Sequence, residues 1–314
     1  MIYVAMTDLI KRSALSVGLV SAIAVLSACG GGGGGNSTPQ TSDVASSSVV
    51  NQASSSAVSQ SSAQSSTEQV SMTGKITFDL VPHEDSGFAS YLNYDDIQVV
   101  PARGVKVELL DSLNQTVAET ITDSEGNYAF VVSPNRNVKV RVRAQLASDN
   151  YLITLRDNTR SGAEYVLDGS LASSGTSNAQ TRDLHAASGW DNQQRAYTSE
   201  RQSAPFAIAD AIYESLELVM GAESNLNFPD LNVYWSKDNT LMSGSFSEGA
   251  IGSSLYLSGQ GDDEGIYILG WENNDTDEFD RSVIQHEFGH YIEDKLSRSE
   301  SIGGSHSLTG SIDM

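Results

Sequence analysis

Two histidines and a glutamate form a five-residue pattern near the end of the chain, His286-Glu287-Phe288-Gly289-His290. On a helix, residues four apart lie on one face, so both imidazoles can bind one Zn²⁺ at about 2.0 to 2.1 Å. Glu287 shares this face and can take a proton from a zinc-activated water and pass it to the leaving amine of a peptide. The pattern predicts that His286 and His290 are zinc ligands and that Glu287 is the catalytic base.

Histidine is scarce in this chain, with five residues in 314, which makes the spacing of His286 and His290 more informative. The alternative is a pair of core histidines with a surface glutamate between them. The chain has one cysteine, Cys29, which excludes an intrachain disulfide and a metal site built from several thiolates. Any metal must therefore be held by histidines and carboxylates.

The segment 277–298 that carries the pattern has the charge distribution of a helix, with acidic residues at its start and Lys295 and Arg298 at its end. Its apolar residues are too many for a narrow stripe, so we expect burial over much of its circumference. Gly289 lowers helix propensity by about 1 kcal/mol relative to alanine, and we expect close packing against a neighbour to explain it. These apolar residues are Phe279, Val283, Ile284, Phe288, Tyr291, Ile292 and Leu296.

Upstream of this helix, residues 203–221 have apolar side chains at helical spacing, with Pro205 near the start and Gly221 at the end. Three short runs rich in β-formers follow, at 231–235, 254–257 and 266–271, and they predict strands of one sheet.

Residues 203–298 resemble the core of a zincin metallopeptidase, with a backing helix, strands and an active-site helix bearing His-Glu-x-x-His. The resemblance implies an α+β fold, a peptide or protein substrate, and a strand at 266–269 that lines the cleft. It also implies a third zinc ligand. Glu293 and Leu296 stand where the metzincin pattern requires Gly and His, which excludes that subclass.

The third ligand is not evident in the sequence. The weak candidates downstream are Glu300, His306 and Asp313, while Glu293 and Asp294 share the helix of the histidines and suit outer contacts to the ligands. Our preferred interpretation is a catalytic domain truncated at Met314, with the ligand beyond it.

At the other end of the chain, Lys11 and Arg12 precede an apolar run too short to span a bilayer, which is typical of a secretory signal. Leu26-Ser27-Ala28-Cys29 resembles a lipobox, which implies lipidation of Cys29 and a membrane anchor; the alternative is an ordinary signal peptide. Gly30 follows the cysteine in place of the Asp of inner-membrane retention, so we expect the outer membrane of a Gram-negative bacterium.

Between the anchor and the helices, residues 29–71 are rich in Gly and Ser and predict a disordered tether. From residue 72, period-two alternation predicts half-buried strands around 105–109 and 138–142. The stretch 122–130, Thr-Asp-Ser-Glu-Gly-Asn-Tyr-Ala-Phe, resembles the signature of transthyretin-like (carboxypeptidase regulatory-like) domains, which implies an accessory all-β sandwich.

The predicted fold class is thus multidomain, a transthyretin-like β-sandwich followed by an α+β zincin-like domain truncated at its C-terminus. The predicted boundaries are 1–28 signal peptide, 29–71 tether, 72–170 sandwich and 171–314 catalytic domain.

A net charge of -22 excludes nucleic acid as a partner. The acidic run 273–278 lacks the residues of an EF-hand. The predicted function is a lipid-anchored zinc metallopeptidase; the alternatives are an inactive surface binding or adhesion lipoprotein and a structural envelope lipoprotein.

Overall fold

The computed structural model describes residues 69–85, 90–176, 180–259, 263–273 and 275–297. The chain divides into two compact units, Met1–Ser62 and Ala63–Met314, and all of the described residues lie in the second. The predicted signal peptide, Cys29 and nearly all of the predicted tether lie outside the described residues. The predicted boundary at residue 170 stays a prediction.

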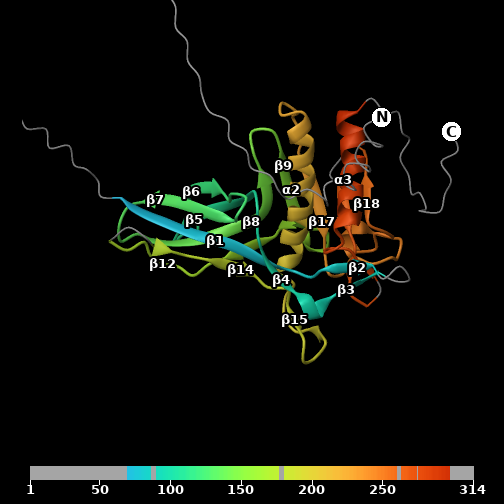
Figure 1. The fold of residues 1–314 in the computed structure, drawn as a ribbon, viewed down its shortest axis with the longest axis horizontal. Coiled ribbons are helices and arrows are strands. Elements are labelled where there is room, and N and C mark those ends of the chain that lie inside the picture. Colours follow the sequence, from blue (N-terminus) through green and yellow to red (C-terminus); the bar gives the residue numbers. More distant parts are fainter. Residues whose placement is uncertain (1–68, 86–89, 177–179, 260–262, 274, 298–314) are drawn as a thin grey trace, which may run out of the picture. The chain divides into compact units, whose positions relative to one another are not determined.

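A five-stranded sheet is organised around β1 (Val70–Leu80), the blue strand of Figure 1. On one side β1 pairs antiparallel with β7 and then with β4, and on the other it pairs in parallel with β13 and β14. From Val70 to Phe78 alternate residues of β1 are buried, as expected for a strand with one face toward a core. The partner strands are β4 (Gln98–Pro101), β7 (Asn127–Val132), β13 (Gln180–Thr181) and β14 (Leu184–Ala186).

A ten-stranded sheet holds the remaining long strands, with the main order β18-β19-β17-β9-β8-β5-β6. The short strands β10 (Ala163–Glu164), β11 (Val166–Asp168) and β12 (Ala172–Ser173) pair at its margin with β9 or β8. The other strands are β5 (Val105–Asp111), β6 (Thr116–Ile121), β8 (Asn137–Ala147), β9 (Leu152–Asp157), β17 (Leu231–Trp235), β18 (Leu255–Leu257) and β19 (Gly265–Ile268).

The strands and the turn predicted in the first half of the chain are confirmed. The alternating apolar residues of β5 and β8 are buried, and Tyr128 and Phe130 face the interior from β7. In the turn before β7, Asp123 Oδ1 accepts hydrogen bonds from the amides of Glu125 and Asn127, and Gly126 has a φ of +79°. The Asp and Gly of this turn therefore have the local roles that their types predict.

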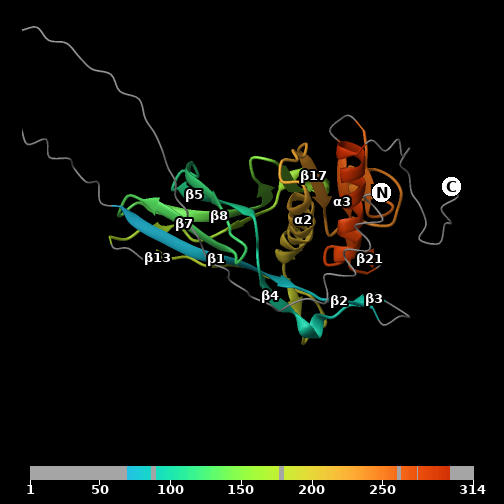
Figure 2. The ribbon, with the colours of Figure 1, turned by 45° about the horizontal axis from the view of Figure 1, so that its top comes forward.

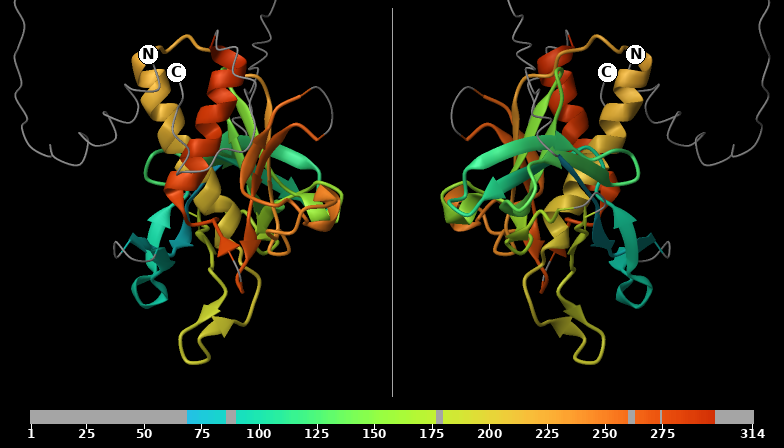
Figure 3. Two further views of the ribbon diagram at one scale, coloured as in Figure 1. Left: turned by 90° about the vertical axis from the view of Figure 1, so that its right-hand side faces the viewer. Right: turned by 90° about the vertical axis from the view of Figure 1, so that its left-hand side faces the viewer.

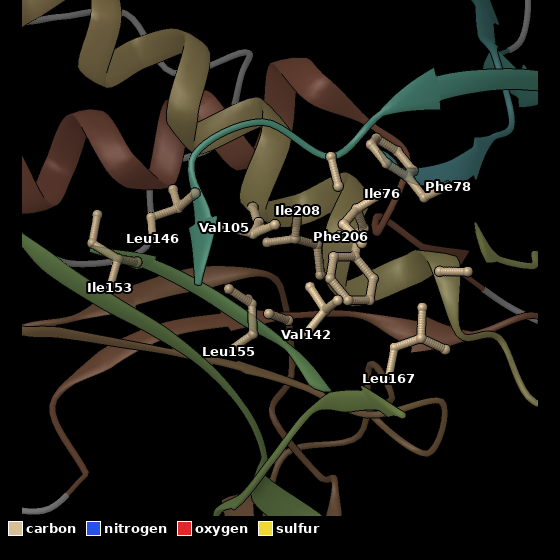
Figure 4. Packing of buried hydrophobic residues seen from close by; sticks show 14 of the residues in the cluster. Ile76, Phe78, Val105, Val142, Leu146, Ile153, Leu155, Leu167, Phe206 and Ile208 are labelled. Atoms are coloured by element: carbon tan, nitrogen blue, oxygen red, sulfur yellow. The ribbon is translucent and has the colours of Figure 1, made fainter. Parts of the chain in front are cut away.

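The core lies between the two sheets and helix α2 (Ser203–Ala222), as Figure 4 shows. Each of these elements contributes fully buried side chains, so residues distant in sequence share one apolar interior. The residues labelled in Figure 4 are Ile76, Phe78, Val105, Val142, Leu146, Ile153, Leu155, Leu167, Phe206 and Ile208.

Helix α3 (Arg281–Leu296) packs against α2 and against β18 and β19, and Figure 3 shows the two helices side by side. Both predicted helices are confirmed, although α3 begins later than expected because Asp280 caps it. None of the helices in the described part of the chain is long and apolar enough to cross a bilayer.

Three short hairpins and three 3-10 turns complete the described structure. The first hairpin, β2 (His83–Asp85) with β3 (Ser90–Leu92), lies beyond the end of β1, as Figure 2 shows. The other hairpins are β15 (Trp190–Asp191) with β16 (Ala196–Tyr197) and β20 (Gly270–Trp271) with β21 (Asp275–Thr276), and the turns are η2 (Tyr94–Asp96), η3 (Asn158–Arg160) and η4 (Phe246–Glu248).

The predicted fold class, a sandwich followed by an α+β zincin-like domain, is wrong. More of the described residues lie in strands than in helices, and two α-helices are among these elements. The described residues contain no group of three or more metal-binding side chains. β17 pairs in parallel with β9, so strands from the C-terminal half continue the sheet formed by β5, β8 and β9. The sequence predicted β5, β8 and β17 but not β9, and local patterns carry no information on which strands pair.

Candidate metal centre

Helix α3 starts at a well-formed N-cap. Asp280 Oδ1 accepts hydrogen bonds from the amides of Ser282 (3.0 Å) and Val283 (3.2 Å), which satisfies donors that the helix leaves unpaired. Asp280 Oδ2 lies 3.3 Å from His83 Nε2 on β2. His83 therefore contacts the residue that caps the helix carrying the candidate site.

The core-facing side of α3 fixes how the helix is rotated. Ile284, Phe288 and Tyr291 are buried, and the Tyr291 hydroxyl donates a hydrogen bond to the carbonyl of Pro229. Val283, Ile292 and Leu296 are only half-buried, so burial covers less of the circumference than the sequence predicts. The predicted close packing at Gly289 is wrong, because a Cβ there would meet nothing within 4 Å among the described residues.

The two histidines of the pattern lie together on α3. Their Nε2 atoms are 3.1 Å apart, and the rings are nearly perpendicular, with centroids 4.6 Å apart. Two nitrogens bound to one tetrahedral zinc, each at about 2.0 to 2.1 Å, are about 3.3 Å apart. The separation of His286 Nε2 and His290 Nε2 therefore fits two ligands of a single Zn²⁺, with little movement of either ring.

Glu287 lies beside this pair with only 8% of its surface exposed. Its Oε2 accepts a hydrogen bond of 2.7 Å from the amide of Tyr256 on β18. Burial raises the pKa of Glu287 to about 7, and the Tyr256 amide partly opposes this rise. A cation held by the two histidines would oppose it further, because it favours the ionised carboxylate.

A third metal ligand is not found among the described residues, where no three metal-binding side chains come together. Glu293 Oε2 lies 3.8 Å from His290 Nδ1, the nitrogen opposite the candidate metal-binding one, so it suits an outer contact. The candidates Glu300, His306 and Asp313 lie outside the described residues. His286 and His290 thus fit two zinc ligands, and the identity of the third stays a prediction.

Both β18 and β19 contact α3. The resemblance implies that the segment 266–269 lines the cleft, and this stays a prediction. β19, which contains most of that segment, pairs with β17 on one side and with β18 on the other. β18 is at the end of the sheet order, and Tyr256 at its centre contacts Glu287. Sequence reasoning identified this strand but gave Tyr256 no role, because nothing local signals its contact with a helix further along the chain.

Two buried carboxyl groups precede α3. Glu278 is fully buried and forms an ion pair with Arg201, while Asp277 accepts a 2.6 Å hydrogen bond from Ser254 Oγ. Burial raises the pKa of Asp277 to about 7, and the Ser254 hydroxyl partly opposes this. These contacts connect the residues before α3 to those just before α2 and β18, so they help to place the candidate site.

Comparison with known proteins adds little to this geometry. No family model matches the chain, and no curated protein matches it. A candidate carbohydrate-binding protein from Pseudomonas aeruginosa, a solved structure, shares 12% identity with it. The match covers 37% of this chain and 88% of that one, with a TM-score of 0.21, so it supports no statement on fold or function.

Proposed function

We propose that the protein is a zinc-dependent peptidase, with His286 and His290 as two ligands of the metal and Glu287 as the base. The observation that carries this proposal is the 3.1 Å separation of the two Nε2 atoms, which is close to the spacing of two ligands on one tetrahedral ion. The position of Glu287 beside these ligands, in a largely buried setting, supports its role as the base.

The chemistry divides between the metal and the protein. A Zn²⁺ held by His286 and His290 would supply Lewis-acid chemistry, which polarises the scissile carbonyl and acidifies water. Glu287 would accept a proton from the water while the water oxygen bonds to the carbonyl carbon. Glu287 would then give that proton to the amine nitrogen as the C–N bond breaks. The Tyr256 amide holds one carboxylate oxygen of Glu287, which restricts the positions available to the base.

The cellular setting of this activity is also a proposal. Cys29 would carry the lipid that anchors the chain, and an outer-membrane position of a Gram-negative cell agrees with Gly30 beside it. The substrate would then be a peptide or protein reached from the membrane surface. The net charge of -22 argues against a nucleic-acid partner.

A second candidate is a binding or adhesion lipoprotein without catalytic activity. It is favoured by one observation, that no three metal-binding side chains lie together among the described residues. A catalytic zinc site normally has three protein ligands and one open position. The two candidates differ in an observable way, because only the first predicts metal-dependent hydrolysis.

The test uses the full chain, with zinc measured by atomic spectroscopy and with cleavage of an unfolded protein measured with and without a chelator. We expect about one zinc per chain and cleavage that the chelator stops. Glu287→Gln should lower kcat at least about 100-fold while zinc stays bound. Glu217→Gln, a change of an exposed carboxylate on α2, is the matched control and should have no effect. Zinc binding without cleavage would favour the second candidate, and full activity in Glu287→Gln would exclude Glu287 as the base.

A further inference from the structure

Tyr256 contacts three residues on one face of α3. Its amide donates to Glu287 Oε2, its ring meets the Tyr291 ring edge to face with centroids 6.0 Å apart, and its hydroxyl donates to Asp294 Oδ2 at 2.8 Å. Positions 287, 291 and 294 are four and three residues apart, so they form one stripe along about two turns of helix. A single side chain and its amide therefore bind a continuous stripe of α3.

These contacts matter because β18 is a short strand at one end of the sheet. It has three residues and lies at the end of the sheet order, where it pairs only with β19 among the described strands. The amide of Tyr256 points away from β19, since it donates to Glu287 on α3. Among the described residues it is the only hydrogen-bond donor to the Glu287 carboxylate. The position of that carboxylate thus depends on where β18 lies.

We infer that Tyr256 is a positioning residue for Glu287: its hydroxyl and ring hold β18 against α3, so that its amide keeps the carboxylate in place. The inference rests on the proposed function for the role of Glu287 as a base, although the contact itself can be measured without it. No local sequence pattern around Tyr256 predicts this role.

The acceptor of the Tyr256 hydroxyl is itself fixed by charge. Lys295 Nζ lies 3.1 Å from Asp294 Oδ2 and 2.5 Å from Glu264 Oε1, and Glu264 Oε1 is also 3.4 Å from the Tyr256 hydroxyl. The hydroxyl therefore lies against two carboxylates that one ammonium group holds together. Because Glu264 immediately precedes β19, this cluster connects β18, β19 and α3.

Tyr256→Phe tests the inference because it keeps the ring on Tyr291 and removes only the hydroxyl. Asp294→Ala is a second variant, which removes the acceptor and leaves Tyr256 intact. The control is Tyr267→Phe on the neighbouring strand, whose hydroxyl donates to the Asp263 carbonyl and whose ring packs in a different apolar cluster. All three are made in the full chain, and their folding is checked by thermal unfolding.

The first measurement is hydrogen exchange at the residue 256 amide in metal-free protein, followed by NMR. We expect about tenfold faster exchange in Tyr256→Phe and in Asp294→Ala, and no change in Tyr267→Phe. The second measurement is peptide cleavage by the zinc-loaded protein. There the first two variants should lower kcat about tenfold and change KM less than about twofold, since the substrate contacts remain.

The outcomes separate this inference from the proposed function. Wild-type exchange and wild-type kcat in a folded Tyr256→Phe would overturn the positioning role. If wild-type protein cleaves no peptide but exchange still accelerates in Tyr256→Phe and Asp294→Ala, Tyr256 does position Glu287 and the peptidase proposal is wrong. An equal loss of kcat in Tyr267→Phe would show a general weakening of the sheet and would also overturn the inference.

Discussion

Arg201 and Glu278 form a buried ion pair that joins the start of α2 to the residues preceding α3. Arg201 Nη1 donates to Glu278 Oε1 at 2.9 Å and to the Gly270 carbonyl at 2.7 Å, and Glu278 is fully buried. The guanidinium also lies over the Tyr197 ring, with its carbon 4.0 Å from the ring centroid. One arginine thus links the residues just before α2 to the residues just before α3.

Arg201→Ala should lower the free energy of unfolding by about 3 to 5 kcal/mol, because it leaves Glu278 buried without a cation. Burial raises the pKa of Glu278 and Arg201 opposes that rise, so the variant should lose more stability as pH increases and the carboxylate must ionise. Urea unfolding at two pH values measures both effects. Arg195→Ala, at an exposed pair with Asp95, is the control and should cost at most about 1 kcal/mol. Equal losses of unfolding free energy in Arg201→Ala and Arg195→Ala would contradict the stabilising role of the buried pair between Arg201 and Glu278.

Asp280→Ala should lower the free energy of unfolding by about 1 to 2 kcal/mol, because the two amides that Asp280 caps lose their acceptor. Asp280→Asn keeps a capping oxygen and changes only the charge that faces His83, so it should cost much less. Chemical denaturation of the two variants distinguishes the cap from the contact with His83. A loss in Asp280→Asn as large as that in Asp280→Ala would show that the contact with His83 dominates.

Asp277 should make the protein less stable as pH rises toward neutrality. Its pKa in the folded protein is about 7 against an ordinary value of 3.8. Between these values the folded state binds more protons than the unfolded state, so this group's contribution to the free energy of unfolding falls as pH increases. Asp277→Asn removes the ionisable carboxyl group and with it this pH-dependent loss of stability, so it should raise Tm at pH ~8 by about 2 to 4 °C.

The measurement for Asp277 is Tm across about pH 5 to pH 8, where the wild type should decline more steeply than Asp277→Asn. Asp238→Asn, at an exposed aspartate, is the control and should follow the wild-type curve. Parallel curves for wild type and Asp277→Asn would mean that Asp277 is ionised in the folded protein throughout this range.

Gly289→Ala should raise the free energy of unfolding by about 0.5 to 1 kcal/mol, because alanine favours the helix and its methyl group meets open space among the described residues. Gly74→Ala should destabilise the protein, since a Cβ there would overlap the Arg182 carbonyl and the Tyr128 ring. Thermal unfolding of the two variants measures both effects. A loss of stability in Gly289→Ala would show that a neighbour does pack against this position.

Zinc should raise the Tm of the wild-type chain, since an ion that binds only the folded state adds about 2.7 kcal/mol at about 100 times its Kd. His290→Ala should abolish this shift because one of the two ligands is lost. His185→Ala, which changes a histidine on β14 that contacts Asp79, is the control and should keep it. A zinc shift that survives in His290→Ala would place the metal elsewhere.

The local features of this protein follow from its sequence. Period-two alternation predicted β5 and β8, the Asp-x-x-Gly turn predicted the start of β7, and helical spacing predicted α2 and α3. His286, Glu287 and His290 also come together on one face by sequence alone, because four residues make about one helical turn. Each of these signals depends only on neighbours within a few positions.

Only the tertiary structure decided how these elements combine. The pairing of β17 (Leu231–Trp235) with β9 (Leu152–Asp157) places both strands in one sheet, and it is a contact between residues far apart in the chain. The same holds for Tyr256 and Glu287, and for Arg201 and Glu278. Strand pairing and buried polar contacts depend on the global packing that excludes water from them, and no short-range pattern encodes which distant partner a strand or a charge will meet.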